Sequence, residues 1–283
     1  MHTPQFTPDF VERGYNNRAA VPDHPIFLAR FAAESAAARA RYRHRVDLRY
    51  GPGPLETLDL FLPETTPLGT FVFIHGGYWR ALDKSDHSLV VGPFVEQGLA
   101  VAVINYDLCP AVSIPHIVDE CRRAMVWIVR EGPAHGANAG NVVVGGHSAG
   151  GHLAAMMFCT DWRRLGLFRP PMVGGVSLSG VHDLTPLVHF SYNNELKLDL
   201  DVAAHMSPVN FAPTTDSPFL IACGAAETSE FLRQSALLWD AWPQVRRPAG
   251  APMVLADMHH FNVVLEYARP DSALTQATLG LLR

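Results

Sequence analysis

The strongest chemical signal in the sequence lies in the stretch from Asn141 to Ala155, which reads NVVVGGHSAGGHLAA. Three consecutive valines are followed by Gly146-x-Ser148-x-Gly150 and then by residues that favour a helix. This order is typical of a strand, a sharp turn and a helix, with a serine hydroxyl exposed at the turn. We therefore predict that Ser148 is a nucleophile. A plain glycine-rich turn would contain the same glycines, so the prediction depends on what the rest of the chain supplies.

A serine is a weak nucleophile unless a base, usually a histidine held by a carboxylate, removes its proton. When the serine follows a strand in this way, the carboxylate and then the histidine come later in the chain. Glu227 closely follows the apolar run Phe219–Cys223, and Glu230 lies in the same junction. The position of Glu227 at the strand end favours it as the acid, and the role of Glu230 stays open.

The base is expected after the last apolar run, Met253–Ala256. Two adjacent histidines, His259 and His260, occupy that place. Neighbouring residues on a loop point in different directions, so one of the pair is expected to reach Ser148. Phe261 can bury behind His260, which favours His260 as the base. A histidine that merely caps the closing helix is the alternative, and the role of His259 stays open.

Backbone N–H groups must stabilise the oxyanion that forms when a serine attacks a carbonyl carbon. Ala149 follows the nucleophile directly and supplies one such group. The sequence HGGY at 75–78, after the apolar run 70–74, is similar to the loops that supply the others. Two adjacent glycines let the backbone turn its N–H groups inward. We therefore predict an oxyanion hole formed by Gly76, Gly77 and Ala149, although this loop alone would also fit an ordinary turn.

The composition fits a globular protein and excludes several classes of partner. The 283 residues are 48% hydrophobic and 17% charged, and the formal net charge of −5 without a basic cluster argues against nucleic acid. No apolar stretch is long enough to span a membrane, and the first residues lack a signal-peptide pattern. His147 and His152 lack the spacing of a metal site, so neither a metal nor a cofactor is expected. We expect a small-molecule substrate, a cytoplasmic setting and free cysteines, and a homodimer is compatible with the sequence.

From residue 70 onward, apolar runs of strand length alternate with helical patterns. Strands are expected at 44–50, 55–62, 70–74, 99–105, 142–144, 173–179, 219–223 and 253–256, and helices at 25–43, 86–98, 114–130, 229–242, 263–282 and after Ser148. This alternation predicts an α/β fold with a mostly parallel central sheet and helices on both faces. No convincing linker divides the chain, so a single domain over 1–283 is expected, with 1–43 and 182–213 as elements of a small cap.

Several motifs together give the chain a resemblance to a known family. They are HGGYW at 75–79, GHSAGG at 146–151, SGVHDL at 179–184, ETSEFLRQS at 227–235 and HF at 260–261. The chain resembles an α/β-hydrolase of the arylformamidase (kynurenine formamidase) type, related to the hormone-sensitive-lipase-like esterases. The resemblance implies the α/β-hydrolase fold, with Ser148 as nucleophile, Glu227 as acid and His260 as base. The acid is commonly Asp in that family, so the longer Glu side chain departs from its pattern.

The resemblance also implies the reaction, the cleavage of an aryl formamide such as N-formyl-L-kynurenine to kynurenine and formate. Tyr78, Trp79 and Tyr192 are expected to line an aromatic substrate pocket, although each would also fit core packing. Two other interpretations stay open. A carboxylesterase acting on short-chain acyl esters would use the same residues, because fold and triad do not fix the substrate. A non-catalytic binding module with this fold would be expected to lack part of the triad.

Overall fold

The apolar runs of the sequence form one sheet in the computed structural model, which describes residues 6–282. Its strands are β1 (His44–Arg49), β2 (Thr57–Phe61), β3 (Thr70–Ile74), β4 (Ala100–Ile104), β5 (Val142–His147), β6 (Gly174–Leu178), β7 (Phe219–Gly224), β8 (Arg246–Arg247) and β9 (Met253–Leu255). Their order is β1-β2-β4-β3-β5-β6-β7-β8, with β9 also paired to β7. The pairs β1–β2 and β2–β4 are antiparallel, and the other pairs are parallel.

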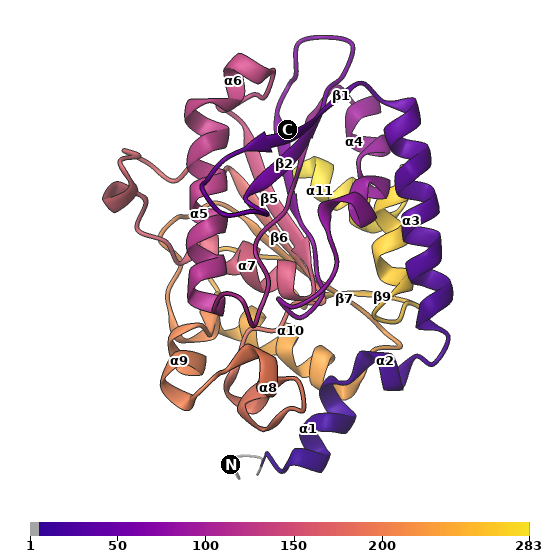
Figure 1. Ribbon diagram of the computed structural model, residues 1–283, viewed down its shortest axis with the longest axis vertical. Coiled ribbons are helices and arrows are strands. Elements are labelled where there is room, and N and C mark those ends of the chain that lie inside the picture. The colour runs from indigo at the N-terminus through magenta and orange to yellow at the C-terminus, as the bar shows by residue number, and fades with distance from the viewer. Residues whose placement is uncertain (1–5, 283) are drawn as a thin grey trace.

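Helices cover both faces of this sheet (Figure 1). The α-helices are α1 (Pro8–Tyr15), α2 (Asn17–Ala20), α3 (His24–Arg41), α4 (Gly92–Glu96), α5 (Ile114–Arg130), α6 (Gly132–His135), α7 (Ala149–Phe158), α8 (Asn193–Leu196), α9 (Leu200–His205), α10 (Ser229–Ala241) and α11 (Ala273–Gly280). The 3₁₀ helices are η1 (Lys84–Val90), η2 (Trp162–Leu165), η3 (Thr185–His189), η4 (Pro208–Asn210) and η5 (Asn262–Ala268). Among the helices of residues 6–282, none combines the length and apolar composition needed to cross a membrane.

Two hydrophobic cores form because successive side chains of a strand point to opposite faces of the sheet. Val72 of β3 lies in one core with Leu153 of α7, and α5 and α10 contribute to the same core. Phe71 and Phe73 of β3 lie in the other core with Phe31 of α3, together with α4 and α11. The central strands are therefore buried on both faces, as is typical of parallel sheets. The predicted mostly parallel sheet with helices on both faces is confirmed.

Two predicted helices are wrong in their length, because a proline interrupts each of them. The helix predicted at 86–98 is η1 followed by α4, and Pro93 lies at the start of α4. The helix predicted at 263–282 is η5 followed by α11, with Pro270 between them. Proline has no N–H group to donate within a helix and starts a new helix more easily than it continues one. The hydroxyl of Ser272 then caps α11.

The part of the chain before the first expected helix forms two short helices that no helical pattern in the sequence indicates. The hydroxyl of Thr7 accepts a hydrogen bond from the N–H of Phe10 and caps α1. The side-chain oxygen of Asn16 accepts a hydrogen bond from the N–H of Ala19 at 3.0 Å and caps α2. These caps satisfy N–H groups that otherwise lack partners at a helix start. Short helices are thus stabilised by single side chains in an otherwise polar segment.

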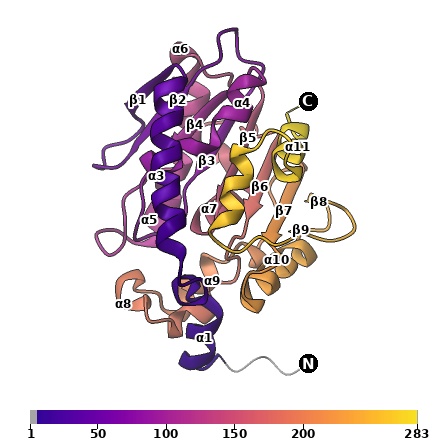
Figure 2. The same ribbon diagram turned by 90° about the vertical axis from the view of Figure 1, so that its right-hand side faces the viewer.

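Of the two segments expected to form a cap, 182–213 and the helices α1 and α2 lie at one end of the molecule, whereas α3 runs along a face of the sheet (Figures 1 and 2). Helix α1 lies near α8 in both views (Figures 1 and 2). The segment 182–213 consists of the short elements η3, α8, α9 and η4 joined by loops, in line with its irregular sequence. Residues 1–5 of the expected cap element 1–43, and residue 283, lie outside the described residues.

Candidate active site

Ser148 lies at a tight turn between β5 and α7. Its φ of 57° and ψ of −119° lie in a region that L-residues rarely adopt, so the backbone is strained at this position. The flanking glycines have no room for a side chain. A Cβ on Gly146 would lie 2.3 Å from the carbonyl oxygen of Gly150, and a Cβ on Gly150 would lie 2.0 Å from that of Ile74. The strand, turn and helix expected around Ser148 are therefore present.

A chain of hydrogen bonds links Ser148 to two side chains that follow other strands. His260 Nε2 lies 3.0 Å from Ser148 Oγ, and His260 Nδ1 lies 2.7 Å from Glu227 Oε2. Glu227 follows β7 and His260 follows β9, which pairs with β7. Because parallel strands end at the same edge of the sheet, residues far apart in sequence meet there. At these distances a histidine can take a proton from a serine while a carboxylate orients the imidazole.

Glu227 is held by its second carboxylate oxygen. Its Oε1 accepts a hydrogen bond from the N–H of Gly224 at 2.8 Å and another from the hydroxyl of Ser179. Hydrogen bonds to both oxygens fix the orientation of the carboxylate toward His260. The Glu227 side chain thus reaches the imidazole without losing its own anchors.

The loop that follows β3 passes directly beside Ser148. A Cβ on Gly76 would lie 2.9 Å from the carbonyl oxygen of His147 and 3.1 Å from the Cβ of Ser148. Gly77 has a φ of 111°, which only glycine adopts without strain. Within residues 6–282, neither the N–H of Gly77 nor that of Ala149 donates a hydrogen bond. Both groups are therefore available to bind a developing negative charge.

His75 fastens this loop to the neighbouring strand. Its Nε2 lies 2.9 Å from Asn105 Oδ1, its Nδ1 lies 2.7 Å from the carbonyl oxygen of Gly76, and its ring stacks on Tyr106 at 4.3 Å. Burial lowers the pKa of His75 to about 4, so the imidazole is neutral at pH 7. A neutral ring donates one of these two hydrogen bonds and keeps the loop in place without adding charge.

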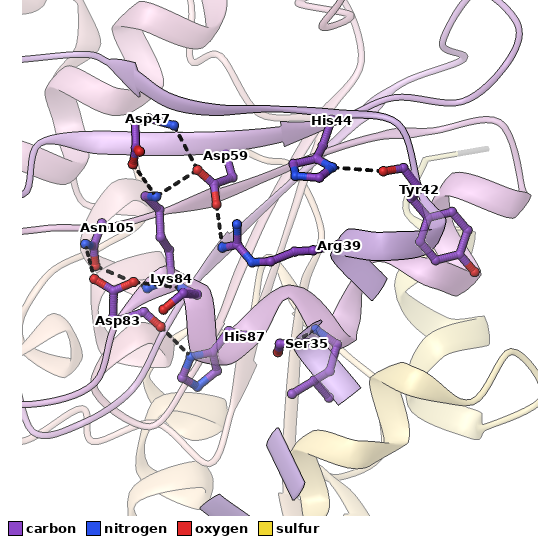
Figure 3. Close-up of polar contacts among 12 residues, drawn as sticks. Ser35, Arg39, Tyr42, His44, Asp47, Asp59, Asp83, Lys84, His87 and Asn105 are labelled. Atoms are coloured by element: carbon purple, nitrogen blue, oxygen red, sulfur yellow. Dashed lines mark hydrogen bonds and ion pairs between the residues drawn. The ribbon is translucent and has the colours of Figure 1, made fainter. Parts of the chain in front are cut away.

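Figure 3 shows the polar cluster that holds Asn105. Asn105 Nδ2 donates a hydrogen bond to Asp83 Oδ2 at 2.7 Å. In the same view, Asp59 of β2 lies between two cations, with Lys84 Nζ at 2.7 Å and Arg39 Nη2 of α3 at 2.5 Å. Buried charges of this kind are stable only when paired, so the cluster ties α3 to β2 and η1. It thereby fixes the N-terminal part of the chain against the sheet.

A cavity opens beside Ser148 and His260, and its walls come from several separate parts of the chain. The lining contains Asn17, Arg18, Leu28 and Phe31 from the N-terminal helices, Gly77, Tyr78 and Arg80 from the loop after β3, His87 from η1, and Tyr192 from the segment 182–213. His147 and Phe261 complete the part nearest the nucleophile. The candidate catalytic residues therefore face a space that the two expected cap segments help to enclose.

Two of the three aromatic residues predicted to contact substrate line this cavity. The rings of Tyr78 and Tyr192 meet edge to face at 5.5 Å, and the hydroxyl of Tyr78 donates a hydrogen bond to the carbonyl of Tyr15. Trp79 lies elsewhere: its side chain is fully buried and meets the ring of His152 edge to face at 5.0 Å. The structure thus places Trp79 in the core, which corrects its assignment to the substrate pocket.

The structure also places the two residues whose roles the sequence left open. The carboxylate of Glu230 accepts hydrogen bonds from the hydroxyl of Tyr15 at 2.9 Å and from Arg233 Nη2 at 2.8 Å. It therefore anchors α1 instead of contacting the candidate base. The ring of His259 meets Phe27 of α3 edge to face at 4.6 Å. Both residues hold the N-terminal helices against the C-terminal part of the chain.

Some cavity residues were not recognised as such from the sequence. Asn17, Arg18 and Arg80 belong to no motif, and only the packing of α1, α2 and the loop after β3 brings them to the cavity.

His147 is adjacent to the nucleophile, and its ring centre lies 4.7 Å from that of His260. Burial and the neighbouring His260 lower the pKa of His147 well below its ordinary value, which keeps this ring neutral.

One group of side chains has the arrangement of metal ligands, away from the cavity. Within the described part of the chain, Glu56, His116 and Glu120 place one donor atom each within 4.8 Å of one another. Arg123 pairs with Glu56 in the same place and supplies positive charge there. None of these residues lines the cavity beside the nucleophile.

Comparison with known proteins adds to this geometry. A family model described as BD-FAE matches residues 58–165, which include the loop after β3 and Ser148. The chain is 29% identical over 255 residues to a kynurenine formamidase of Salmo salar, a match that covers 87% of this chain and 84% of the relative. It is 30% identical over 242 residues to a kynurenine formamidase of Drosophila melanogaster, with 81% and 78% covered.

Solved structures share the same architecture. A candidate thioesterase of Silicibacter sp. tm1040 has a TM-score of 0.80 and 35% identity, with 94% of this chain and 97% of that chain covered. Esterase B of Lactobacillus rhamnosis has a TM-score of 0.70 at 21% identity, with 95% and 94% covered. The second similarity concerns the fold alone, which is that of the α/β-hydrolases, as expected from the sequence.

Proposed function

Because the chain belongs to the kynurenine formamidase family of α/β-hydrolases, enzymes that act on amide or ester bonds, we propose that it hydrolyses aryl formamides. N-formyl-L-kynurenine is the proposed substrate, and kynurenine and formate are the products. The proposed catalytic residues are Ser148 as nucleophile, His260 as base and Glu227 as the acid that orients it. The observation that carries the proposal is the continuous hydrogen-bonded chain of these three side chains beside the cavity.

The first half of the proposed reaction forms an acyl-enzyme. Ser148 Oγ attacks the formyl carbon while His260 Nε2 takes the hydroxyl proton. The carbonyl electron pair moves onto oxygen, and the N–H groups of Gly77 and Ala149 stabilise this oxyanion. Gly76 contributes by bringing the loop into contact with the turn at the nucleophile. Glu227 stabilises the imidazolium that forms.

The second half releases both products. His260 donates its proton to the nitrogen of the arylamine as the C–N bond breaks, which leaves a formyl ester on Ser148. A water molecule then attacks this ester, with His260 as its base, and formate leaves. An arylamine is a better leaving group than an alkylamine because its ring delocalises the nitrogen electron pair. The mechanism therefore suits an anilide.

We further propose that 1–43 and 182–213 together form the cap of a single domain. Asn17 and Tyr192 line the same cavity, one from each segment, which supports a shared role in enclosing substrate. The hydrogen bond from Tyr78 to Tyr15 links the N-terminal part to the loop after β3. Closure over the site would exclude water from the reacting groups.

The direct test combines product analysis with covalent labelling. Wild-type protein incubated with N-formyl-L-kynurenine is expected to release formate and kynurenine in equal amounts, and Ser148→Ala protein is expected to release neither. A phosphonate ester should label Ser148 of the wild type, as peptide mass spectrometry would show. Carboxylesterase activity remains the second proposal, since the same atoms serve an ester. Absence of both labelling and turnover would support the third interpretation, a non-catalytic binding module.

A further inference from the structure

The charge of the cavity lining differs from that of the whole chain. The chain has a formal net charge of −5 at pH 7. Among the described residues that line the cavity, Arg18 and Arg80 are charged, and no aspartate or glutamate is present. Glu227 contacts His260 from outside the lining. A cleft lined by one sign of charge attracts ligands of the opposite sign, so this cavity favours anions.

The two arginines differ in how their charge is balanced. Arg80 Nη2 lies 2.5 Å from Glu195 Oε1, and its guanidinium lies over the ring of Tyr192 at 4.4 Å. Arg18 is exposed, and within residues 6–282 its side chain forms neither an ion pair nor a hydrogen bond. The charge of Arg18 is therefore the one at the cavity that a ligand can neutralise.

Asn17 provides a second, independent indication of a polar ligand. Its side chain is only 4% exposed and lines the cavity. Its Nδ2 group is buried without a hydrogen-bond partner among the described residues. The side chain of Asn16 caps α2, so the side-chain amide of Asn17 is not needed to cap this helix. An unpaired buried donor costs free energy, which a ligand that accepts its hydrogen bond would recover.

We propose that Asn17 and Arg18 form a subsite for a carboxylate of the substrate. Arginine binds a carboxylate through two parallel N–H groups, and the Asn17 amide adds a third donor. A formyl group carries nothing beyond hydrogen, so the carboxylate must belong to the arylamine half of the molecule. The proposal rests on the proposed formamidase function and narrows its substrates to N-formyl arylamines with a carboxylate on the amine side.

The subsite is held in place before substrate arrives. The hydroxyl of Tyr15 donates a hydrogen bond to Glu230 and accepts one from Gln234 Nε2 at 2.7 Å. The carbonyl of Tyr15 accepts the hydrogen bond of the Tyr78 hydroxyl. These contacts fix the chain two residues before the subsite, and preorganisation of this kind reduces the cost of binding. The N–H groups proposed to bind the carboxylate are thereby held in a fixed position relative to the loop proposed to bind the oxyanion.

The test uses two substrates that differ in one charge, N-formyl-L-kynurenine and its carboxamide, with formate release as the readout. In Arg18→Ala protein we expect kcat/KM for the acid to fall about 10- to 100-fold, mainly through KM, and kcat/KM for the carboxamide to change less than about threefold. Arg13→Ala is the matched control, because Arg13 is exposed on α1 and does not line the cavity. Asn17→Ala should show the same pattern with a smaller loss.

Salt supplies an independent readout. Higher ionic strength should lower kcat/KM of the wild type for the acid and leave that of Arg18→Ala protein nearly unchanged. An equal loss on both substrates in Arg18→Ala protein would overturn the subsite. Formanilide, which has no carboxylate, separates the two proposals. If the wild type hydrolyses formanilide and does not prefer the acid over the carboxamide, the subsite fails while the formamidase function stands. If it hydrolyses none of the three formamides, the function itself fails.

Discussion

The two walls of the cavity are built in different ways. One wall contains Ser148 and His260, with Glu227 behind it. All three residues follow parallel strands, so the backbone of the sheet sets their positions. The other wall consists of the N-terminal helices, which are held by side chains that reach across the molecule. Tyr15 binds Glu230, and Phe27 packs against His259.

This difference implies that the sheet-end wall carries out catalysis and that the N-terminal wall selects the substrate. Atoms positioned by the ends of a rigid sheet keep the distances that proton transfer requires. A wall held by a few side-chain contacts can change its residues without disturbing those distances. We therefore expect substitutions on the sheet-end wall to lower kcat for every substrate. Substitutions on the N-terminal wall should change KM, selectivity or stability.

The largest effect is expected from Ser148→Ala. The substitution removes the nucleophile and should lower kcat by at least roughly three orders of magnitude for formamides and esters alike. The fold should persist, because a smaller side chain fits the turn, and circular dichroism would check this. Near-normal turnover by a folded Ser148→Ala protein would exclude serine catalysis.

The adjacent histidines contact different parts of the molecule, His260 the nucleophile and His259 a helix of the N-terminal wall, and should respond differently. His260→Ala removes the base and should lower kcat by roughly 10³-fold or more. His259→Ala loses the contact with Phe27 and should cost about 1–2 kcal/mol of stability, with kcat changed less than about threefold. Thermal unfolding and steady-state kinetics on both variants give the comparison. If His259→Ala were the more damaging to kcat, the base would be misassigned.

The two glutamates give a closer comparison, because they lie three residues apart. Glu227→Gln should mis-set the tautomer of His260 and lower kcat roughly 10²- to 10⁴-fold with little change in KM. Glu230→Gln should weaken the binding of Tyr15 and raise KM several-fold while kcat stays near that of the wild type. Initial-rate measurements over a range of substrate concentrations separate the two parameters. The reverse result would place the acid one turn later.

The smallest effect concerns stability at low pH, because His75 in the loop after β3 and His87 of η1 are buried. Burial lowers the pKa of His75 and of His87 to about 4. Between pH 6.5 and 4 the unfolded chain therefore binds protons at these rings that the folded chain does not, and the free energy of unfolding falls as pH falls through this window. His87→Gln should reduce this proton uptake by about one, and His205→Gln, at an exposed position, serves as the control. The melting temperature measured against pH checks this, and an unchanged slope in His87→Gln would contradict it.

The sheet-end wall could be predicted from the sequence because local patterns encode it. A valine run, two glycines and a serine define the turn at Ser148, and an apolar run places Glu227 at the end of β7. The choice between His259 and His260 depended on which way adjacent residues point, and the structure brings His260 to Ser148. The geometry therefore matches the hypothesis for this wall.

The N-terminal wall could not be predicted in the same way. Arg18 and Asn17 lie in a polar segment without a motif. The chain just before them is held by hydrogen bonds of Tyr15 to Tyr78 and Glu230, which are more than sixty positions away from it. The direction of the Trp79 side chain could not be predicted either. Its φ is 55°, and the side chain is buried in the core. The periodicity of strands and helices does not apply to a residue with such a backbone angle. Long-range packing and unusual backbone angles leave no simple trace in the pattern of residue types.

The most direct test of the central claim compares acyl groups on the wild-type enzyme, with Ser148→Ala as the blank. The cavity next to Ser148 is lined by Tyr78 and His147, so a formyl group should fit better than larger acyl groups. Each methylene that does not fit should cost about 1–3 kcal/mol in transition-state binding. The measurement is kcat/KM for N-formyl-L-kynurenine, formyl and acetyl anilides, and p-nitrophenyl esters from acetyl to butyryl. We predict that formyl anilides exceed acetyl anilides and that ester activity falls from acetyl to butyryl. A rise in kcat/KM with acyl length, together with no release of formate from N-formyl-L-kynurenine, would contradict the formamidase function and identify a carboxylesterase.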